Sequence, residues 1–134
     1  MKMTKEDWKS VRYFTPDEWG DWEQVDRELI FLLDSIRHNA KKPVVIHCAY
    51  ATAGHSEHSY HYRGMAVDFH ILGMHVVDQF LLASRYSEVG GIGVYPYWNS
   101  PGLHIDLRPG RTMWGRTAKG TYLPLTWDFI QGIV

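Results

Sequence analysis

Apolar residues between positions 24 and 38 recur at the three- and four-residue spacing of an α-helix, and polar residues fill the remaining positions. This pattern predicts a helix that packs one face against a core. Residues 76–86 show a shorter pattern of the same kind and predict a second helix, packed on a sheet. Upstream, Thr15 and Glu18 have the spacing of a capping box, which predicts a short helix that ends near Gly20.

Four short runs of β-branched and apolar residues predict strands. They lie at residues 43–49, 65–71, 92–95 and 103–108. Beyond Pro109 the sequence is rich in glycine and threonine, and we expect its apolar end, residues 123–134, to help close the domain. With 134 residues and no linker, repeat or low-complexity tract, the chain is expected to form one domain, residues 1–134.

The strand pattern also predicts which side chains share a face. Side chains alternate along a strand, so Asp68 and His70 point away from the apolar residues of their strand. By the same rule, His104, Asp106 and Arg108 share the polar face of the last predicted strand. A carboxylate at Asp68 would be costly to bury unpaired among apolar neighbours, and a metal ion or a cationic partner would remove that cost.

Composition excludes several classes of function. Hydrophobic residues make up 45% of the chain and the formal net charge is −1, so we expect no surface for nucleic acid or an anionic membrane. No run approaches the roughly 20 apolar residues of a membrane span. The N-terminal residues include no apolar secretory core, so synthesis in the cytoplasm is expected, and action outside the cell would need release by another route. The single cysteine, Cys48, excludes an internal disulfide, and its apolar neighbours predict a buried, unreactive thiol.

Histidine is the unusual component, because six of the eight histidines fall within residues 47–75. His61 and Asp68 lie seven residues apart, and His104 follows on a later strand; together they predict a metal site with three ligands. Imidazole nitrogen and carboxylate oxygen suit zinc at about 2.0–2.2 Å, and three protein ligands leave the fourth position open for water, as catalytic sites do. Gly64 can take a positive φ at little cost, which lets the chain turn from the first ligand into the strand of the second.

An alternative metal set is His55, His58 and His61, which are spaced by three residues. These would converge only if the segment were helical. Gly54 and the neighbouring serines favour a loop instead.

A zinc site of this kind would polarise a carbonyl group and lower the pKa of its bound water to about 7. A nearby carboxylate would then take the proton of the water and pass it to the leaving amine. Asp106 is the first candidate for this general base. The alternative is that Asp106 orients a histidine or pairs with Arg108. Glu57 and His58, in the loop before His61, are further candidates for the base.

At these motifs the chain resembles the zinc D-Ala-D-Ala carboxypeptidase and L-alanyl-D-glutamate endopeptidase family, which has the Hedgehog/DD-peptidase fold. The family pattern S-x-H-x-x-G-x-A-x-D is met by Ser59, His61, Gly64, Ala66 and Asp68. His104 in LHIDLR matches the last ligand. GIGVYP at residues 91–96 and YFTPDEW at residues 13–19 are also similar to segments of small bacterial and phage members, so the resemblance spans roughly residues 13–115.

The resemblance implies an α+β fold with a small antiparallel sheet flanked by helices. It implies zinc bound by His61, Asp68 and His104, and hydrolysis of an amide bond in peptidoglycan stem peptides, as a carboxypeptidase or an endopeptidase. The small size suggests a phage or prophage lysis enzyme. An alternative is a zinc-binding module of the same fold without hydrolytic activity, and a third class is a structural protein that needs no metal.

Two positions depart from the family. Many members carry an arginine that binds the substrate carboxylate where this chain has Ala51, so that contact is either missing or supplied elsewhere, with Arg63 and Arg108 as the candidates. Many members also have an acidic residue three positions before the last ligand, where this chain has Pro101. Both departures concern the substrate and the base, and neither concerns the metal.

Overall fold

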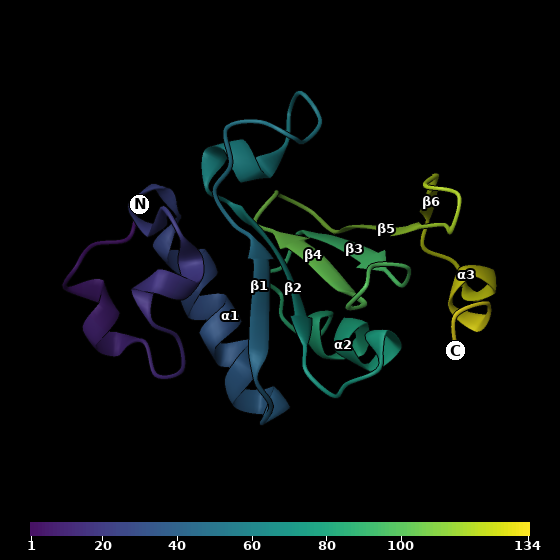
Figure 1. Ribbon diagram of the computed structural model, residues 1–134, viewed down its shortest axis with the longest axis horizontal. Coiled ribbons are helices and arrows are strands. Elements are labelled where there is room, and N and C mark those ends of the chain that lie inside the picture. The colour runs from purple at the N-terminus through teal and green to yellow at the C-terminus, as the bar shows by residue number, and fades with distance from the viewer.

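The computed structural model describes all residues, 1–134, and its centre is a sheet of six strands in the order β1-β2-β4-β3-β5-β6 (Figure 1). The strands are β1 Val44–Cys48, β2 Ala66–Ile71, β3 Gly91–Tyr95, β4 Gly102–Asp106, β5 Thr112–Arg116 and β6 Tyr122–Pro124. Neighbouring strands are antiparallel except for β3 and β5, which are parallel. The predicted α+β class is confirmed, and the sheet is mixed because of that single parallel pair.

Three α-helices and four short 3₁₀ helices accompany the sheet. They are α1 Arg27–Ala40, α2 Val76–Ala83, α3 Trp127–Gln131, η1 Asp7–Ser10, η2 Pro16–Trp19, η3 Trp22–Gln24 and η4 Tyr60–Arg63. The capping box predicted from Thr15 and Glu18 is present at the start of η2, which ends at Gly20. None of the helices has the length and the apolar character needed to cross a bilayer.

Helix α1 begins three residues later than the sequence pattern predicts. The reason is local, because the side chain of Asp26 accepts a hydrogen bond from Glu28 N at 2.9 Å and caps the helix there. The preceding residues are already turned into η3. At the other end Lys41 adopts a left-handed conformation, with φ of 57°, and its N–H bonds back to Arg37.

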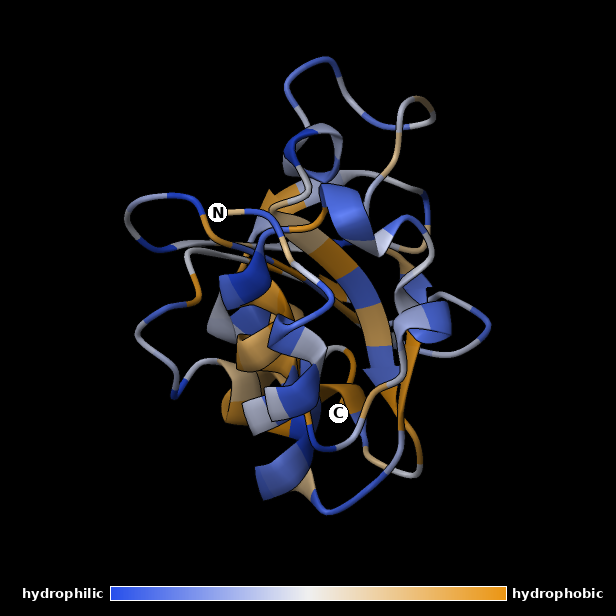
Figure 2. Cartoon of the chain, turned by 90° about the vertical axis from the view of Figure 1, so that its left-hand side faces the viewer, coloured by the Kyte–Doolittle hydropathy of each residue, from blue (hydrophilic) through white to orange (hydrophobic).

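The two faces of the sheet differ in chemistry. One face joins the hydrophobic core, in which α1 and α2 pack on the strands; Phe69 of β2 and Ile105 of β4 are completely buried there. Figure 2 shows hydrophobic residues gathered where helices meet strands, whereas the loops are mostly hydrophilic. The other face carries Asp68, His104 and Asp106, as the alternation predicts. We call this second side the polar face.

The N-terminal segment is held against α1 by a buried carboxylate. Asp34 is 3% exposed, and it accepts hydrogen bonds from the backbone N–H groups of Arg12 and Tyr13 at 3.1 and 2.9 Å. The segment reaches the site as well, because Asp26 N donates to Gly64 O at 2.8 Å. The turn that carries His61 is therefore tied to the start of α1.

Residues 112–124 form β5 and β6, which the sequence pattern did not predict as strands. Strand β5 is placed by its parallel pairing with β3, and β6 by its antiparallel pairing with β5. Helix α3 follows and lies at the opposite end of the molecule from the N-terminal segment (Figure 1). The ring of Phe129 fills the space beside Gly115 where a Cβ would overlap it.

Candidate metal centre

The candidate site lies on the polar face, along a row of residues in register across neighbouring strands. Cys48 of β1 pairs with Asp68 of β2, and Asp68 pairs with His104 of β4. The row continues through Gly93 of β3 to Trp114 of β5. Residues opposite one another on adjacent strands direct their side chains to the same face. The register alone therefore gathers these side chains.

Gly93 leaves space for the indole of Trp114 beside His104. A Cβ at Gly93 would lie 2.5 Å from Nε1 of Trp114, so the indole occupies the space that a side chain would need. The indole centroid lies 5.2 Å from that of the His104 ring, and Nε1 donates to the hydroxyl of Tyr95 at 3.2 Å. A tryptophan wall therefore stands directly beside one of the predicted ligands.

His61 is placed by the turn before β2. Ser59 caps η4, its Oγ accepting a hydrogen bond from His61 N at 3.2 Å. Gly64 then ends η4 with φ of 67°, and a Cβ there would overlap the carbonyl oxygen of Gln24. Both conformation and space therefore require glycine, which explains its place in the motif. The result is a His61 side chain that is 1% exposed.

Donor atoms of the three predicted ligands face one another. Asp68 Oδ1 lies 3.1 Å from His61 Nε2 and 2.9 Å from His104 Nδ1. Tetrahedral ligands at about 2.1 Å from a zinc ion lie roughly 3.4 Å apart, so an ion between these atoms requires each pair to separate by only about half an ångström. Two imidazoles and a carboxylate at this spacing fit a divalent metal ion.

The other ring nitrogen of each histidine is held by the protein. His61 Nδ1 donates to the carbonyl oxygen of Ala49 at 2.7 Å, and His104 Nε2 donates to Asp106 Oδ2 at 2.7 Å. Such contacts fix the tautomer and the ring orientation of a metal-binding histidine. They leave His61 Nε2 and His104 Nδ1 as the nitrogens available to a metal.

Asp106 lies beneath the site and is completely buried. Both carboxylate oxygens are occupied, since they also accept from Gly91 N at 2.9 Å and from Arg108 Nε and Nη2 at 2.9 and 2.7 Å. Gly91 makes this possible, because a Cβ there would overlap the carboxylate. Asp106 therefore has no face toward solvent, and its contacts match the alternative prediction, a carboxylate that orients His104 and pairs with Arg108, rather than a general base.

The same contacts control the ionisation of the site. Burial opposes protonation of His61, but the hydrogen bond and charge of Asp68, together with the contacts to Cys48 and Ala49, outweigh burial and raise the pKa of His61 to about 10. The pKa of His104 is also raised, against burial, by hydrogen bonds to Asp106 and Asp68. These bonds in turn lower the pKa of Asp68 to about 2, although burial acts in the opposite direction. Without a metal, the raised pKa of His61 makes its ring an imidazolium cation at neutral pH, and the contacts of His104 favour its protonated form.

A cavity of about 830 Å³ opens above the donor atoms. One wall is formed by the loop before His61, and the opposite wall is aromatic. The aromatic wall consists of Tyr95, Trp98, Trp114 and Tyr122. Asp68 is the single carboxylate that lines the cavity, whereas two guanidinium groups, from Arg108 and Arg116, line it.

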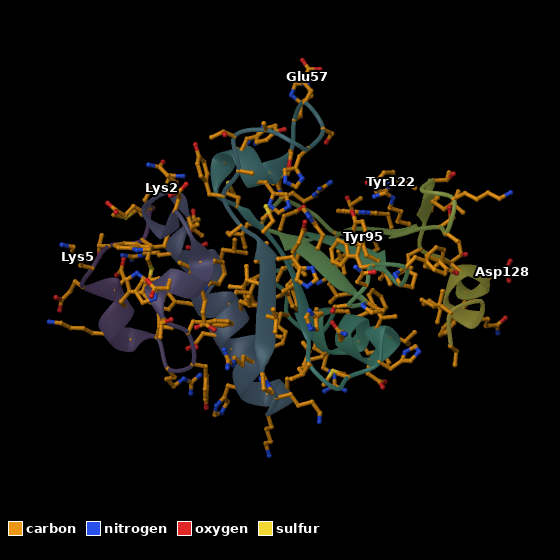
Figure 3. The ribbon with its side chains drawn as sticks, viewed as in Figure 1. Lys2, Lys5, Glu57, Tyr95, Tyr122 and Asp128 are labelled. Carbon is orange, nitrogen blue, oxygen red and sulfur yellow. The ribbon has the colours of Figure 1, made fainter.

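Of the other predicted site residues, only some line this cavity. Arg108 lines it, but Arg63 does not, since its guanidinium lies over the ring of Tyr60 at 4.8 Å. Glu57 stands at the exposed tip of the loop and points away from the site (Figure 3). His58 lines the cavity but does not join the donor set, and residues 51–59 form a loop, as Gly54 and the serines predicted.

The sequence analysis considered His55 only in the alternative metal set, whereas the structure stacks its ring on that of His61 with centroids 4.2 Å apart. Its Nε2 lies 3.5 Å from Sγ of Cys48, and these two side chains with His61 form a second group of possible metal ligands. The Cys48 thiol is therefore half-buried beside the site and not enclosed in the core as predicted. A bulge in β1 after Ile46 turns it to the polar face, and no local sequence pattern signals a bulge.

Metal binding is expected to displace protons from the site. Because the pKa of His61 is raised to about 10 and that of His104 is also raised, a metal must displace a proton from His61 Nε2 and competes with protonation of His104 Nδ1. The apparent affinity for Zn²⁺ should therefore rise between pH 6 and pH 8, by about tenfold per pH unit for each proton displaced. Competition with a chromogenic chelator at several pH values measures this slope. A flat profile would contradict the assignment of these nitrogens.

Asp106 is expected to control metal affinity without touching the metal. In Asp106→Asn the contact to His104 loses its charge, so the ring is held less firmly, and Zn²⁺ affinity should fall about 10- to 100-fold. Isothermal titration calorimetry of the folded variant measures the change. Asp78→Asn, which alters an exposed carboxylate on α2, is the matched control and should leave affinity unchanged. Equal affinities for both variants would refute the positioning role.

Comparison with known proteins identifies the family of the chain. The sequence model of the peptidoglycan L,D-endopeptidase MepK family, a peptidase family, matches residues 5–114. Over 58 residues the chain is 40% identical to the peptidoglycan L,D-endopeptidases MepK of Escherichia coli strain K12, E. coli O157:H7 and Shigella flexneri. This segment is 43% of the chain and spans 30% of the length of each relative. With its family match over residues 5–114 and a metal-ligand cluster within that range, the chain belongs to the MepK family of peptidoglycan endopeptidases.

Proposed function

We propose that the protein is a zinc-dependent endopeptidase that hydrolyses a peptidoglycan amide bond between an L- and a D-configured residue. The observation that carries the proposal is the set of three donors, His61, Asp68 and His104, at the base of an open cavity. Three donors leave a position for water, which separates a catalytic from a structural zinc site. The bond type follows the name of the MepK relatives, whose match supports an endopeptidase over a carboxypeptidase.

Residues of the chain hold and orient the donor set. Bound zinc would supply a polarised carbonyl group and a water of lowered pKa. Asp106 holds His104 in the orientation that presents Nδ1 to the metal, and Arg108 compensates the buried charge of Asp106. Ala49 holds His61 in the same manner through Nδ1. The donor set is thus preorganised before a substrate arrives.

We assign the transfer of the proton from water to the leaving amine to His55. No free carboxylate lines the cavity, since Asp68 belongs to the donor set and Asp106 is buried beneath it. The His55 ring lies against His61, within the cavity, and its Nε2 belongs to the group of atoms next to the donor set. Its backbone is fixed by Tyr62, whose hydroxyl bonds to the carbonyl oxygen of His55 at 2.8 Å. An imidazole at this place can take up and release a proton through Nε2.

Digestion of purified peptidoglycan peptides tests the function. Zinc-loaded protein should cleave an internal amide bond and give products whose masses identify the bond; a chelator should stop the reaction, and added Zn²⁺ should restore it. His104→Ala should be inactive. Release of a single terminal residue would instead indicate a carboxypeptidase. Stoichiometric binding of zinc without any cleavage would favour the zinc-binding module without hydrolytic activity.

His55→Gln should retain bound zinc and lose about 100-fold or more in kcat, which is the usual contribution of a general acid–base group. His58→Gln is the matched control, because His58 lines the same cavity without joining either group of possible ligands. Zinc content is measured by atomic emission and kcat by peptide cleavage. Unchanged kcat in His55→Gln, with zinc retained, would remove His55 from the mechanism.

A further inference from the structure

Two guanidinium groups line the cavity, and only one of them is engaged. Arg108 donates to both oxygens of Asp106, so its charge is neutralised by a buried carboxylate. Its guanidinium is also enclosed between the rings of Tyr60 and Trp114, each about 5.0 Å from it. Arg108 is therefore part of the support beneath His104.

Arg116, at the end of β5, is exposed and forms no ion pair and no side-chain hydrogen bond within the chain. It lies two residues after Trp114, and thus on the same face of the strand. Its guanidinium lies over the ring of Tyr122 at 5.3 Å, which holds it at the cavity rim. The tyrosine comes from β6, the strand paired with β5. A positive charge without an internal partner thus lines the same cavity as the donor set.

The cavity continues past Arg116. A second, smaller pocket of about 160 Å³ shares Arg116, Tyr95 and Trp98 with the main cavity. The rings of Tyr95 and Trp98 are stacked, with centroids 4.3 Å apart, and form a flat surface between the two spaces. Tyr95 and Tyr122 lie together on this side of the sheet (Figure 3). Because Arg116 lines both spaces, an extended ligand that reaches from the donor set into the smaller pocket can contact its guanidinium.

We propose that Arg116 forms a binding subsite for a free carboxylate of the peptide substrate, with the aromatic surface of Tyr95 and Trp98 supporting the adjoining chain. This inference rests on the proposed function, and it names the group of the substrate that is recognised. The planar guanidinium can bind a carboxylate through two parallel hydrogen bonds. Arg116 itself lies outside residues 5–114, in the part of the chain that the family match does not cover.

The test uses a series of stem peptides in which each free carboxylate is converted, one at a time, to a carboxamide. With the zinc-loaded wild type, kcat/KM should fall about 10- to 100-fold for one of these amides, the loss expected for a charged hydrogen-bonded pair. Arg116→Gln should lose the same factor on the unmodified peptide and should show no further loss on that amide. Such non-additivity identifies a direct pair.

Two further variants sharpen the result. Arg116→Lys keeps the charge without the planar geometry and should recover part of the loss. Arg85→Gln removes an exposed arginine that lines neither pocket and should leave kcat/KM unchanged. If Arg116→Gln has no effect, or lowers kcat/KM equally for the acid and for every amide, the subsite is refuted.

Failure of the proposed function gives a different result. If zinc-loaded wild type cleaves none of the peptides, the endopeptidase assignment fails. The subsite is then judged from equilibrium binding of the same peptides to the same protein. Weaker binding of one amide to the wild type, with no such difference in Arg116→Gln, supports the subsite, and equal binding of acid and amides refutes it.

Discussion

The antiparallel pairing of β2 with β4 is the constraint on which the site depends. It sets Asp68 opposite His104 on the polar face, and the same register sets Val67 opposite Ile105 on the core face. A shift of one residue would exchange the two faces, exposing the apolar set and burying the ligands. The hydrophobic effect therefore enforces the geometry of the site, because burying the apolar side chains and aligning the donors are consequences of one register.

Groups of alternating charge lie in a row on that face. Asp68, His104, Asp106 and Arg108 follow one another in direct contact. Each buried charge is compensated by its neighbours, and removing one member leaves another uncompensated, which is far more costly than the pair itself is worth. Glycines on the adjoining strand supply the room, since any side chain at Gly91 or Gly93 would occupy the place of the carboxylate or the indole. Their role is spatial rather than conformational.

Much of this could be predicted from the sequence, because the relevant signals are local. Alternation placed Asp68 and His104 each on the polar side of its own strand, and the spacing of Ser59, His61 and Gly64 indicated the turn before β2. The features that the sequence did not predict depend on pairing between distant segments of the chain. Strand β5 has no clear alternation and exists through its parallel contact with β3, so Arg116 could not be assigned to the cavity. The orientation of Asp106 likewise required the positions of Gly91 and Arg108.

The two sides of the cavity depend on different parts of the fold. Asp68 and His104 lie on central strands that are paired on both sides. Trp114, Arg116 and Tyr122 of the opposite wall lie on β5 and β6 at the margin of the sheet, where α3 is anchored through Phe129 on Gly115. Mutations, insertions or an exchanged C-terminal segment at that margin can alter the shape and charge of the wall while the central register stays intact. We therefore expect substitutions at this margin to change which ligands the cavity accepts while Asp68 and His104 stay aligned.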